Sequence, residues 1–210
     1  VYDISILPNR GDCQSIFGLA RDLAAIFDLP LKLPEIRLKT TPGRVPLKLE
    51  TKDPDLCPLY TLRHLKDVKQ TKTPLWMSRR LELLGIRPIS LIVDITNYVL
   101  LELGQPLHAF DATQLPSRHI QVRLAKDTES LSTLDGAKHN CDSNTLLITD
   151  GKQGVALAGI MGGKDSEITD SSTDLILESA YFDATHTRRS ALKYDLRTES
   201  AIRFEKGVDA

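Results

Sequence analysis

Between residues 118 and 182, short apolar segments alternate with glycine-containing dipeptides, and this pattern constrains the fold more than any other part of the sequence. The segments read HIQVRL, LSTL, TLLIT, VALAGI and DLILES, and they are separated by Asp135-Gly136, Asp150-Gly151 and Gly162-Gly163. Asp-Gly and Gly-Gly pairs between such segments are typical of the tight turns of β-hairpins. We therefore expect a mostly antiparallel sheet system in this region, with the three dipeptides at its turns.

Helical patterns lie on both sides of the expected sheet system. Apolar residues recur with helical spacing over residues 12–27, where Asp12 or Ser15 would cap the first turn. Thr73 and Pro74 are typical of an N-cap and a first helical position. In full, we expect helices at residues 12–27, 73–85, 91–103, 184–194 and 198–206, the last capped by Thr198, and further strands at residues 2–7, 45–51 and 59–67.

These patterns predict an α+β fold in which mixed or antiparallel sheet layers are flanked by helices. A small strand and helix at the N-terminus would form an appendage to it. Prolines at positions 30, 34, 42 and 46 favour an extended linker, because proline fixes φ and lacks an N–H donor. We therefore place a domain boundary near residue 40, with residues 1–40 as appendage and linker and residues 41–210 as the main domain.

The composition is that of a folded protein without a membrane segment. The 210 residues are 41% hydrophobic and 26% charged, which excludes disorder along most of the chain. Apolar runs of only a few residues are too short to span a bilayer. The three cysteines are far apart and odd in number, which favours a reducing, cytoplasmic location over a disulfide framework. The sequence lacks an initiator methionine, so we expect a piece of a longer polypeptide.

Charge is distributed unevenly, although the formal net charge is only −1. Residues 61–90 hold seven lysines and arginines against two acidic residues, whereas residues 126–183 hold four lysines against eleven acidic residues. The basic stretch could face a phosphate backbone. The alternative, which a run of charge alone does not exclude, is an ordinary solvated surface.

Polar residues at three places are candidates for a site. His108 follows a helix end at the start of an extended segment, where side chains are often presented to ligands. It would act as a proton carrier or a hydrogen-bond donor to substrate, or it would be held by nearby backbone or by Asp111. Thr96 and Asn97 need hydrogen-bond partners inside an apolar segment, and either backbone or a polar ligand could provide them.

Glu178 is the third candidate and lies within the near-continuous apolar strand LILESA. A carboxylate in a covered strand must be paired, neutralised or directed into a cavity that receives a hydrogen-bond donor. A hydroxylated ligand would satisfy it. A salt bridge to an arginine is the structural alternative.

The glycine-rich segment at residues 159–163 is not a phosphate-binding P-loop. Ala158 stands where the first glycine belongs, and Asp165 replaces the serine or threonine after the lysine. Its glycines permit a tight turn between strands or a loop that lines a substrate. The five histidines show no zinc-ligand spacing, and neither a GxSxG motif nor a base near Cys141 marks a nucleophile. We therefore expect no bound metal and no covalent nucleophile.

Seven motifs are spread in order along most of the chain. They are DISILPNRGDC at residues 3–13, GIRPI at 85–89, VDITNYV at 93–99, ELGQPLHAFD at 102–111, LAGIMGG at 157–163, LESAYF at 177–182 and LRTESAIRFEKGVD at 196–209. Read together, they resemble the β subunit of bacterial phenylalanyl-tRNA synthetases. The resemblance identifies residues 1–40 as the tail of an N-terminal helical module with its linker, and residues 41–210 as the central editing domain.

The resemblance implies a fragment of a ligase. In this family the editing domain hydrolyses tyrosine wrongly esterified to tRNA(Phe), in support of phenylalanyl-tRNA synthesis by an α2β2 enzyme. ATP and Mg²⁺ would act at the aminoacylation site of the α subunit, so no cofactor is expected in this chain. The implied partners are the acceptor end of tRNA(Phe) and the α subunit. The alternative is a non-catalytic scaffold of the synthetase that binds tRNA.

The family's editing pocket maps onto positions that also stand out for their chemistry. It includes Thr96, Asn97, His108, Gly159, Met161, Gly162, Gly163, Glu178 and Thr198. Glu178 would read the para-hydroxyl of tyrosine, while His108 with Thr96 and Asn97 would orient the ester, the terminal ribose and a water. The family commonly has Ala-Ser after Arg-Thr-Glu, where this chain has Ser200-Ala201. Ser200 would therefore make the pocket slightly smaller and more polar.

Overall fold

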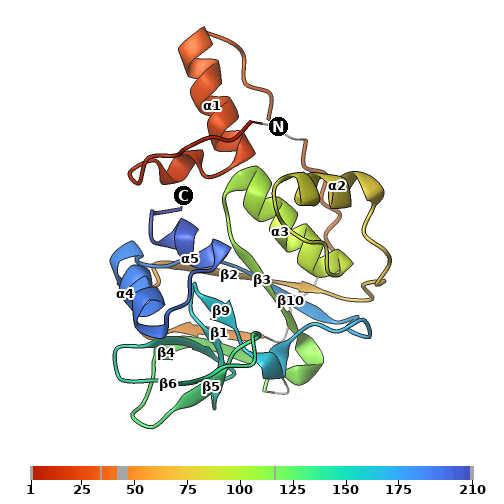
Figure 1. The fold of residues 1–210 in the computed structure, drawn as a ribbon. Helices are drawn as coiled ribbons and strands as arrows, with labels where there is room; N and C mark the ends of the chain where they lie inside the picture. Colours follow the sequence, from red (N-terminus) through yellow and green to blue (C-terminus); the bar gives the residue numbers. More distant parts are fainter. Residues whose placement is uncertain (1, 34, 42–46, 116, 209–210) are drawn as a thin grey trace.

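The structure, a computed structural model, describes residues 2–33, 35–41, 47–115 and 117–208. These residues form an α+β fold, as the sequence predicts (Figure 1). The helices are α1 (Ile16–Phe27), α2 (Leu75–Leu83), α3 (Leu91–Leu103), α4 (Ala184–Tyr194) and α5 (Glu199–Phe204), with short 3-10 helices at Gly11–Cys13, Ala112–Gln114 and Lys164–Ser166.

The strands of the described residues form two larger sheets and one hairpin. The five-stranded sheet has the order β1 (Lys48–Thr51), β4 (His119–Leu124), β7 (Leu146–Thr149), β8 (Gly154–Leu157), β9 (Met161–Gly162). The three-stranded sheet has the order β2 (Leu59–Leu65), β10 (Leu175–Tyr181), β3 (Leu107–Asp111), and β5 (Ser130–Ser132) pairs with β6 (Lys138–Asn140). The β1–β4 pair is parallel and the others are antiparallel, which confirms the predicted mixed and antiparallel layers.

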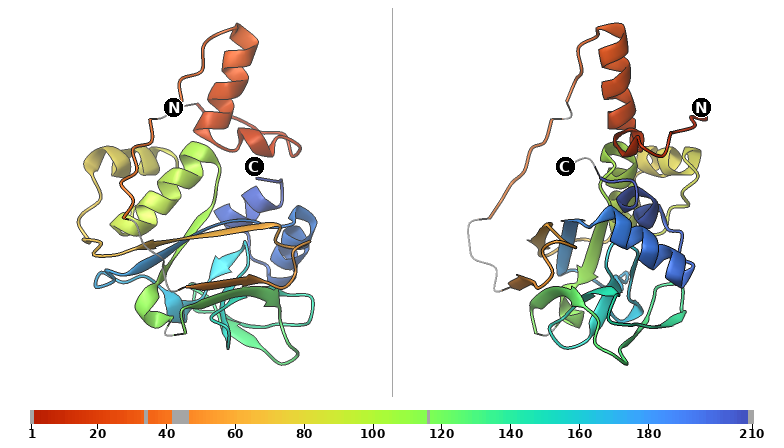
Figure 2. Two further views of the ribbon diagram at one scale, coloured as in Figure 1. Left: turned by 180° about the vertical axis from the view of Figure 1, so that it is seen from behind. Right: turned by 90° about the vertical axis from the view of Figure 1, so that its left-hand side faces the viewer.

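The three-stranded sheet is the middle layer, and both of its faces are covered. One face packs against the five-stranded sheet through a core that includes Phe110 and Ile176. The other face packs against α3 through Ile92, Ala109 and Leu175. Figures 1 and 2 show α2 and α3 on one side of β2, β3 and β10, with the five-stranded sheet on the other side. Successive residues of β10 therefore point into different layers.

The last two helices cover the far face of the five-stranded sheet. Leu147 of β7 and Leu157 of β8 are cross-strand partners, and they pack with Ala191 of α4 and Ala201 of α5. The neighbouring residue Ile148 faces the opposite way, into the core shared with the three-stranded sheet. This packing places the N-terminal end of α5 beside the turn that follows β8.

Two helices show how local signals set the helix ends. α3 has the predicted bounds and ends at Gly104, whose φ of 82° is left-handed. α1 begins later than predicted, because Ser15 is its N-cap and accepts a hydrogen bond from the N–H of Gly18. Asp12 lies in the preceding 3-10 turn, where it accepts hydrogen bonds from Arg10.

Two predictions about the starts of elements are wrong. Residues 2–7 form no strand, since no described strand pairs with them and the Tyr2 side chain is 93% exposed. The N-terminal appendage is therefore α1 with irregular flanking segments rather than a strand and a helix. Thr73 does not cap α2, because Pro74 occupies the N-cap position and the Thr73 hydroxyl donates to Asp94.

Gly162-Gly163 is not a hairpin turn, contrary to the prediction, whereas the two Asp-Gly dipeptides do lie at turns. Gly162 belongs to β9, and Gly163 forms a bridge with Thr133. The chain reverses earlier, directly after β8, where Gly159 has a φ of 69°. A Cβ at this position would lie 2.9 Å from the ring of Phe182. Both the backbone angle and the packing therefore require glycine at the turn.

Part of the expected linker lies outside the described residues, namely Pro34, Pro42, Gly43 and Pro46. Pro30 lies in an irregular, exposed segment after α1. The domain boundary near residue 40 therefore stays a prediction.

We expect Gly159→Ala to lower the free energy of unfolding by more than Gly136→Ala. Both glycines have left-handed φ values, 69° and 84°, which cost a residue with a Cβ about 1–2 kcal/mol. An added Cβ meets nothing within 4 Å at Gly136, whereas at Gly159 it meets Phe182 and Phe204. Such overpacking adds about 1–3 kcal/mol. Urea denaturation measures both losses, and equal losses would mean that the turn relaxes freely.

Candidate functional site

A cavity of about 90 Å³ lies where the two larger sheets meet the turn after β8. Its walls come from β3, β7, β8, β9, β10 and α5, so elements far apart in the sequence build it. It brings together six of the residues predicted from the sequence: His108, Gly159, Met161, Gly162, Glu178 and Ser200. This coincidence makes the cavity the candidate site.

His108 and Glu178 are direct cross-strand partners in the antiparallel β3–β10 pair. Such partners project from the same face of a sheet, with Cβ atoms about 4.5–5.5 Å apart. The neighbouring residues on that face, Phe110 and Ile176, belong to the core between the two sheets. The register therefore places an imidazole and a carboxyl group side by side on one wall of the cavity.

Both side chains carry a buried polar atom without a partner. His108 Nε2 and Glu178 Oε2 form no hydrogen bond with any described residue. Asp111, the alternative partner of His108, instead accepts hydrogen bonds from Thr113 and Ser172. No arginine among the described residues pairs with Glu178 Oε2, so the salt-bridge alternative also fails there. An unpaired buried polar atom costs about 1–3 kcal/mol, which a polar ligand would recover.

Burial keeps both groups uncharged at neutral pH. It raises the pKa of Glu178 to about 8, against a smaller opposing effect of the nearby Tyr60 hydroxyl. It lowers the pKa of His108 to about 4. The site thus presents a neutral carboxylic acid next to a neutral imidazole, and each is able to donate and to accept a hydrogen bond.

Packing contacts fix the ring of His108. Its imidazole meets the ring of Phe110 edge-on, with 4.5 Å between the ring centroids. Gly162 also packs closely against the imidazole, and a Cβ at this position would lie 2.4 Å from His108 Cε1. Any side chain at position 162 would therefore displace the imidazole from the cavity wall.

Two hydroxyl groups at the start of α5 hold the turn at residues 158–160, here called the glycine turn, in place. The Thr198 hydroxyl donates to the carbonyl of Ile160 at 2.8 Å and accepts from the N–H of Ala201, so it also caps α5 as predicted. The Ser200 hydroxyl donates to the carbonyl of Gly159 at 3.1 Å. Thr198 therefore shapes the cavity through the turn, whereas Ser200 both shapes and lines it.

Besides Thr198, three predicted site residues do not line the cavity. Thr96 and Asn97 lie on α3, which covers the opposite face of the three-stranded sheet from His108. The Thr96 hydroxyl donates to the carbonyl of Val93 at 2.8 Å, so backbone satisfies it. Gly163 follows the cavity wall, and its N–H donates to the carbonyl of Val155.

Sequence reasoning missed Tyr60, whose hydroxyl is buried beside Glu178 without a hydrogen-bond partner among the described residues. Tyr60 lies on β2, which pairs with the side of β10 opposite to β3. The alternation in LYTLRHL places it on one face with Leu62 and His64. Only the long-range pairing of β2 with β10 shows that this face adjoins Glu178.

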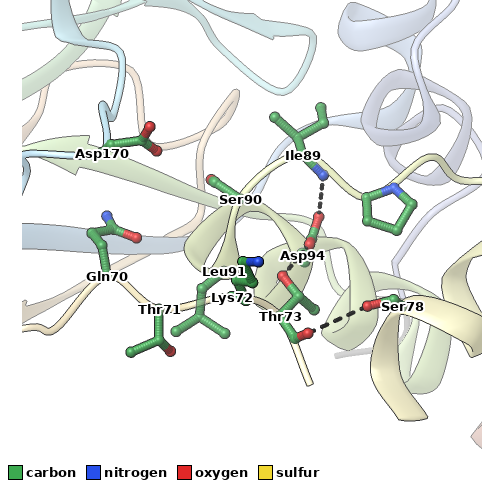
Figure 3. A pocket seen from close by; sticks show the side chains of 11 residues that line it. Gln70, Thr71, Lys72, Thr73, Ser78, Ile89, Ser90, Leu91, Asp94 and Asp170 are labelled. Atoms are coloured by element: carbon green, nitrogen blue, oxygen red, sulfur yellow. Dashed lines mark hydrogen bonds between the residues drawn. The ribbon is translucent and has the colours of Figure 1, made fainter. Parts of the chain in front are cut away.

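A larger cavity of about 470 Å³ lies between the loop before α2 and the start of α3, and it offers no comparable chemistry (Figure 3). Its buried carboxylate, Asp94, already accepts hydrogen bonds from the Thr73 hydroxyl and the N–H of Ile89. Ser78 donates to backbone carbonyls. None of its lining residues carries a buried polar side-chain atom without a partner.

Within the described ranges, no group of three or more His, Cys, Asp and Glu side chains is placed to hold a metal ion. The glycine turn does not form a phosphate cradle, because its carbonyls face α5 and the N–H of Gly163 is already bonded. No helix in the described part of the chain is long and apolar enough to cross a membrane.

We expect Glu178→Gln to remove a pH-dependent loss of stability. The folded state holds the Glu178 proton up to a pKa of about 8, whereas the ordinary value is 4.5. The unfolded state therefore loses this proton first, and the parent chain loses stability as pH rises from about 4.5 to 8. The glutamine variant should gain stability over the parent across this range, by a few kcal/mol.

Denaturation in urea at several pH values measures this difference. Glu167→Gln is the matched control, because Glu167 is exposed and the substitution should leave the pH dependence unchanged. Parallel pH dependences for the parent and Glu178→Gln would contradict the buried, protonated carboxyl.

Comparison with known proteins places the chain in a family. The B3/4 domain family matches residues 56–210. The phenylalanine–tRNA ligase β subunits of Syntrophus aciditrophicus, Nitratidesulfovibrio vulgaris and Bacillus cereus are 49%, 47% and 45% identical to it. Each alignment covers 100% of this chain and 26% of the relative, so the chain spans about a quarter of their length.

Among solved structures, an N-terminal fragment of the phenylalanyl-tRNA synthetase β subunit from Pyrococcus horikoshii matches 84% of this chain and 54% of its own. The TM-score is 0.49 at 14% sequence identity. The family match covers most of the chain, including every residue that lines the cavity between the sheets. The chain therefore belongs to the B3/4 domain family, and it aligns over its whole length with phenylalanine–tRNA ligase β subunits.

Proposed function

We propose that the cavity between the two sheets is an editing site, where tyrosine wrongly esterified to tRNA(Phe) is hydrolysed. The observation that carries the proposal is the pair of buried, unpartnered atoms, His108 Nε2 and Glu178 Oε2, on one wall of the cavity. One ligand with a polar group at each end would satisfy both atoms.

Glu178 selects tyrosine over phenylalanine in this proposal. The para-hydroxyl of tyrosine donates a hydrogen bond to Glu178 Oε2, whereas phenylalanine leaves this buried atom unpaired. Sites built to bond a substrate hydroxyl reject the analogue without it by roughly 10⁴–10⁵-fold. The distinction matters most for this pair of amino acids, because they differ only by that hydroxyl.

His108 orients the ester and a water molecule. Its low pKa of about 4 makes the imidazole a weak base, so its role at neutral pH is hydrogen bonding rather than full proton abstraction. An aminoacyl ester is already activated, and a positioned water suffices for hydrolysis. Thr96 and Asn97 lie behind the sheet, so the proposal gives them no contact with the ester.

The glycine turn is the wall that adjusts to the ligand. A cavity of about 150 Å³ holds a benzene ring in other proteins, so a site of about 90 Å³ must widen to admit the ring of tyrosine. The turn is joined to α5 by the hydrogen bonds of Thr198 and Ser200. In this proposal the turn moves together with the start of α5, to which these bonds join it.

The proposal also names the tRNA and the subunit with which the chain would act. The acceptor end of tRNA(Phe) would reach the cavity mouth, and exposed basic residues such as Arg63, Lys66 and Lys69 offer charge for its phosphates. The chain would act within the β subunit of a cytoplasmic α2β2 phenylalanine–tRNA ligase. ATP and Mg²⁺ would serve the aminoacylation site of the α subunit, outside this chain.

Deacylation assays test the proposal. We expect the chain to hydrolyse Tyr-tRNA(Phe) far faster than Phe-tRNA(Phe), and Glu178→Ala to reduce this preference at least 100-fold, since each lost hydroxyl contact is worth about 3 kcal/mol or more. His108→Ala should slow both substrates alike. Glu167→Ala, which changes an exposed glutamate, is the control.

Two results would contradict the proposal. Unchanged discrimination in Glu178→Ala would remove this residue as the hydroxyl reader. Binding of tRNA without hydrolysis, both by the chain and by the chain assembled with the α subunit, would favour the non-catalytic scaffold instead.

A further inference from the structure

A third unpartnered polar atom adjoins the candidate site. The Tyr60 side chain is buried, and its hydroxyl has no hydrogen-bond partner among the described residues. In the β2–β10 register, Tyr60 pairs with Ala180, two residues from Glu178 on the same face of the strand. Diagonal neighbours of this kind are within reach of an aromatic side chain. The hydroxyl of Tyr60 and the carboxyl of Glu178 are therefore complementary groups in one buried layer.

We propose that Tyr60 is a positioning residue for Glu178, whose carboxyl it holds towards the cavity by donating a hydrogen bond to it. The inference rests on the proposed function for its purpose, but not for its geometry. The ring of Tyr60 is anchored edge-on against Phe182, with 6.4 Å between the ring centroids, and this contact fixes the direction of the hydroxyl. A small rotation of the carboxyl then completes the bond.

The other groups around Glu178 do not compete for this role. His108 faces Glu178 from β3 and lines the cavity. In the proposed function, its Nε2 forms a hydrogen bond with the ligand. Leu62 faces it from β2 and is apolar. Cys57 is the remaining titratable neighbour, and its thiol donates weakly to the carbonyl of Leu59. Burial raises the pKa of Cys57 to about 12, so the thiol stays neutral.

Tyr60 is a permanent donor, because burial and the nearby Glu178 raise the pKa of its hydroxyl well above the ordinary value. A hydrogen bond to a carboxylate stabilises the charged form and lowers its pKa. The nearby Tyr60 hydroxyl lowers the pKa of Glu178, against the larger opposite effect of burial, although the carboxyl must rotate to complete the hydrogen bond. Loss of the Tyr60 hydroxyl should therefore raise the pH at which Glu178 ionises.

Titration of Glu178 in the complete chain tests the proposal. Glutamate carboxyl groups labelled with ¹³C are followed by NMR, and the Glu178 signal is assigned by its absence from Glu178→Gln. Tyr60→Phe should move the midpoint upward by about one pH unit, the shift expected for a charged group that loses one hydrogen bond. Tyr181→Phe is the matched control, because it removes a tyrosine hydroxyl from a residue of β10 that does not line the cavity.

A second variant keeps the test independent of folding defects in Tyr60→Phe. Incorporation of 3-fluorotyrosine at position 60 makes the hydroxyl a stronger donor and should move the midpoint downward. The same midpoint in the parent, the phenylalanine variant and the fluorotyrosine variant would overturn the positioning role.

The titration of Glu178 and the deacylation assay test the positioning role and the proposed function separately. If the midpoint moves as expected but the parent chain fails to deacylate Tyr-tRNA(Phe), the positioning role stands and the proposed function fails. If the parent deacylates Tyr-tRNA(Phe) but Tyr60→Phe leaves both the midpoint and the preference over Phe-tRNA(Phe) unchanged, the positioning role fails and the proposed function stands.

Discussion

The antiparallel register of β10 between β2 and β3 is the constraint on which the site depends. It places Glu178 opposite His108 on one side and next to Tyr60 on the other. A shift of β10 by one residue would turn Glu178 from the inter-sheet layer towards α3, away from His108 and Tyr60. The register is in turn fixed by the apolar residues of the same strands, Phe110 and Ile176 on one face and Ala109 and Leu175 on the other. Core packing therefore specifies the chemistry of the cavity.

Burial also determines the protonation states and the unpaired polar atoms of the site. Burial keeps the acid and the imidazole neutral, and His108 Nε2 and Glu178 Oε2 have no hydrogen-bond partner among the described residues. Unpaired buried polar atoms carry an energetic penalty, which a ligand that matches these groups would relieve. In the proposed editing function, discrimination then follows from what a wrong ligand leaves unpaired, and it requires no charged residue.

Local signals in the sequence predicted much of the fold, whereas long-range pairing decided the rest. Ser15, Thr198 and Gly104 mark helix ends through their own backbone and side-chain chemistry, so their roles follow from neighbouring residues. Residues 2–7 carry an apolar pattern but lack a partner strand, which no local pattern reveals. Glu178 was found because it is a polar residue in an apolar strand, and His108 because it follows a helix end at the start of an extended segment. Tyr60 was not found, because a tyrosine in a strand is ordinary until the partner strand is known.

A structure of the chain bound to a non-hydrolysable 3′-tyrosyl adenosine analogue tests the central claim most directly. The expected result places the para-hydroxyl of the ligand within roughly 3 Å of Glu178 Oε2, with the acyl linkage near His108 and the ring against the turn at Gly159. A ligand seated elsewhere, or one whose hydroxyl points away from Glu178, would contradict the claim that this carboxyl reads the amino acid.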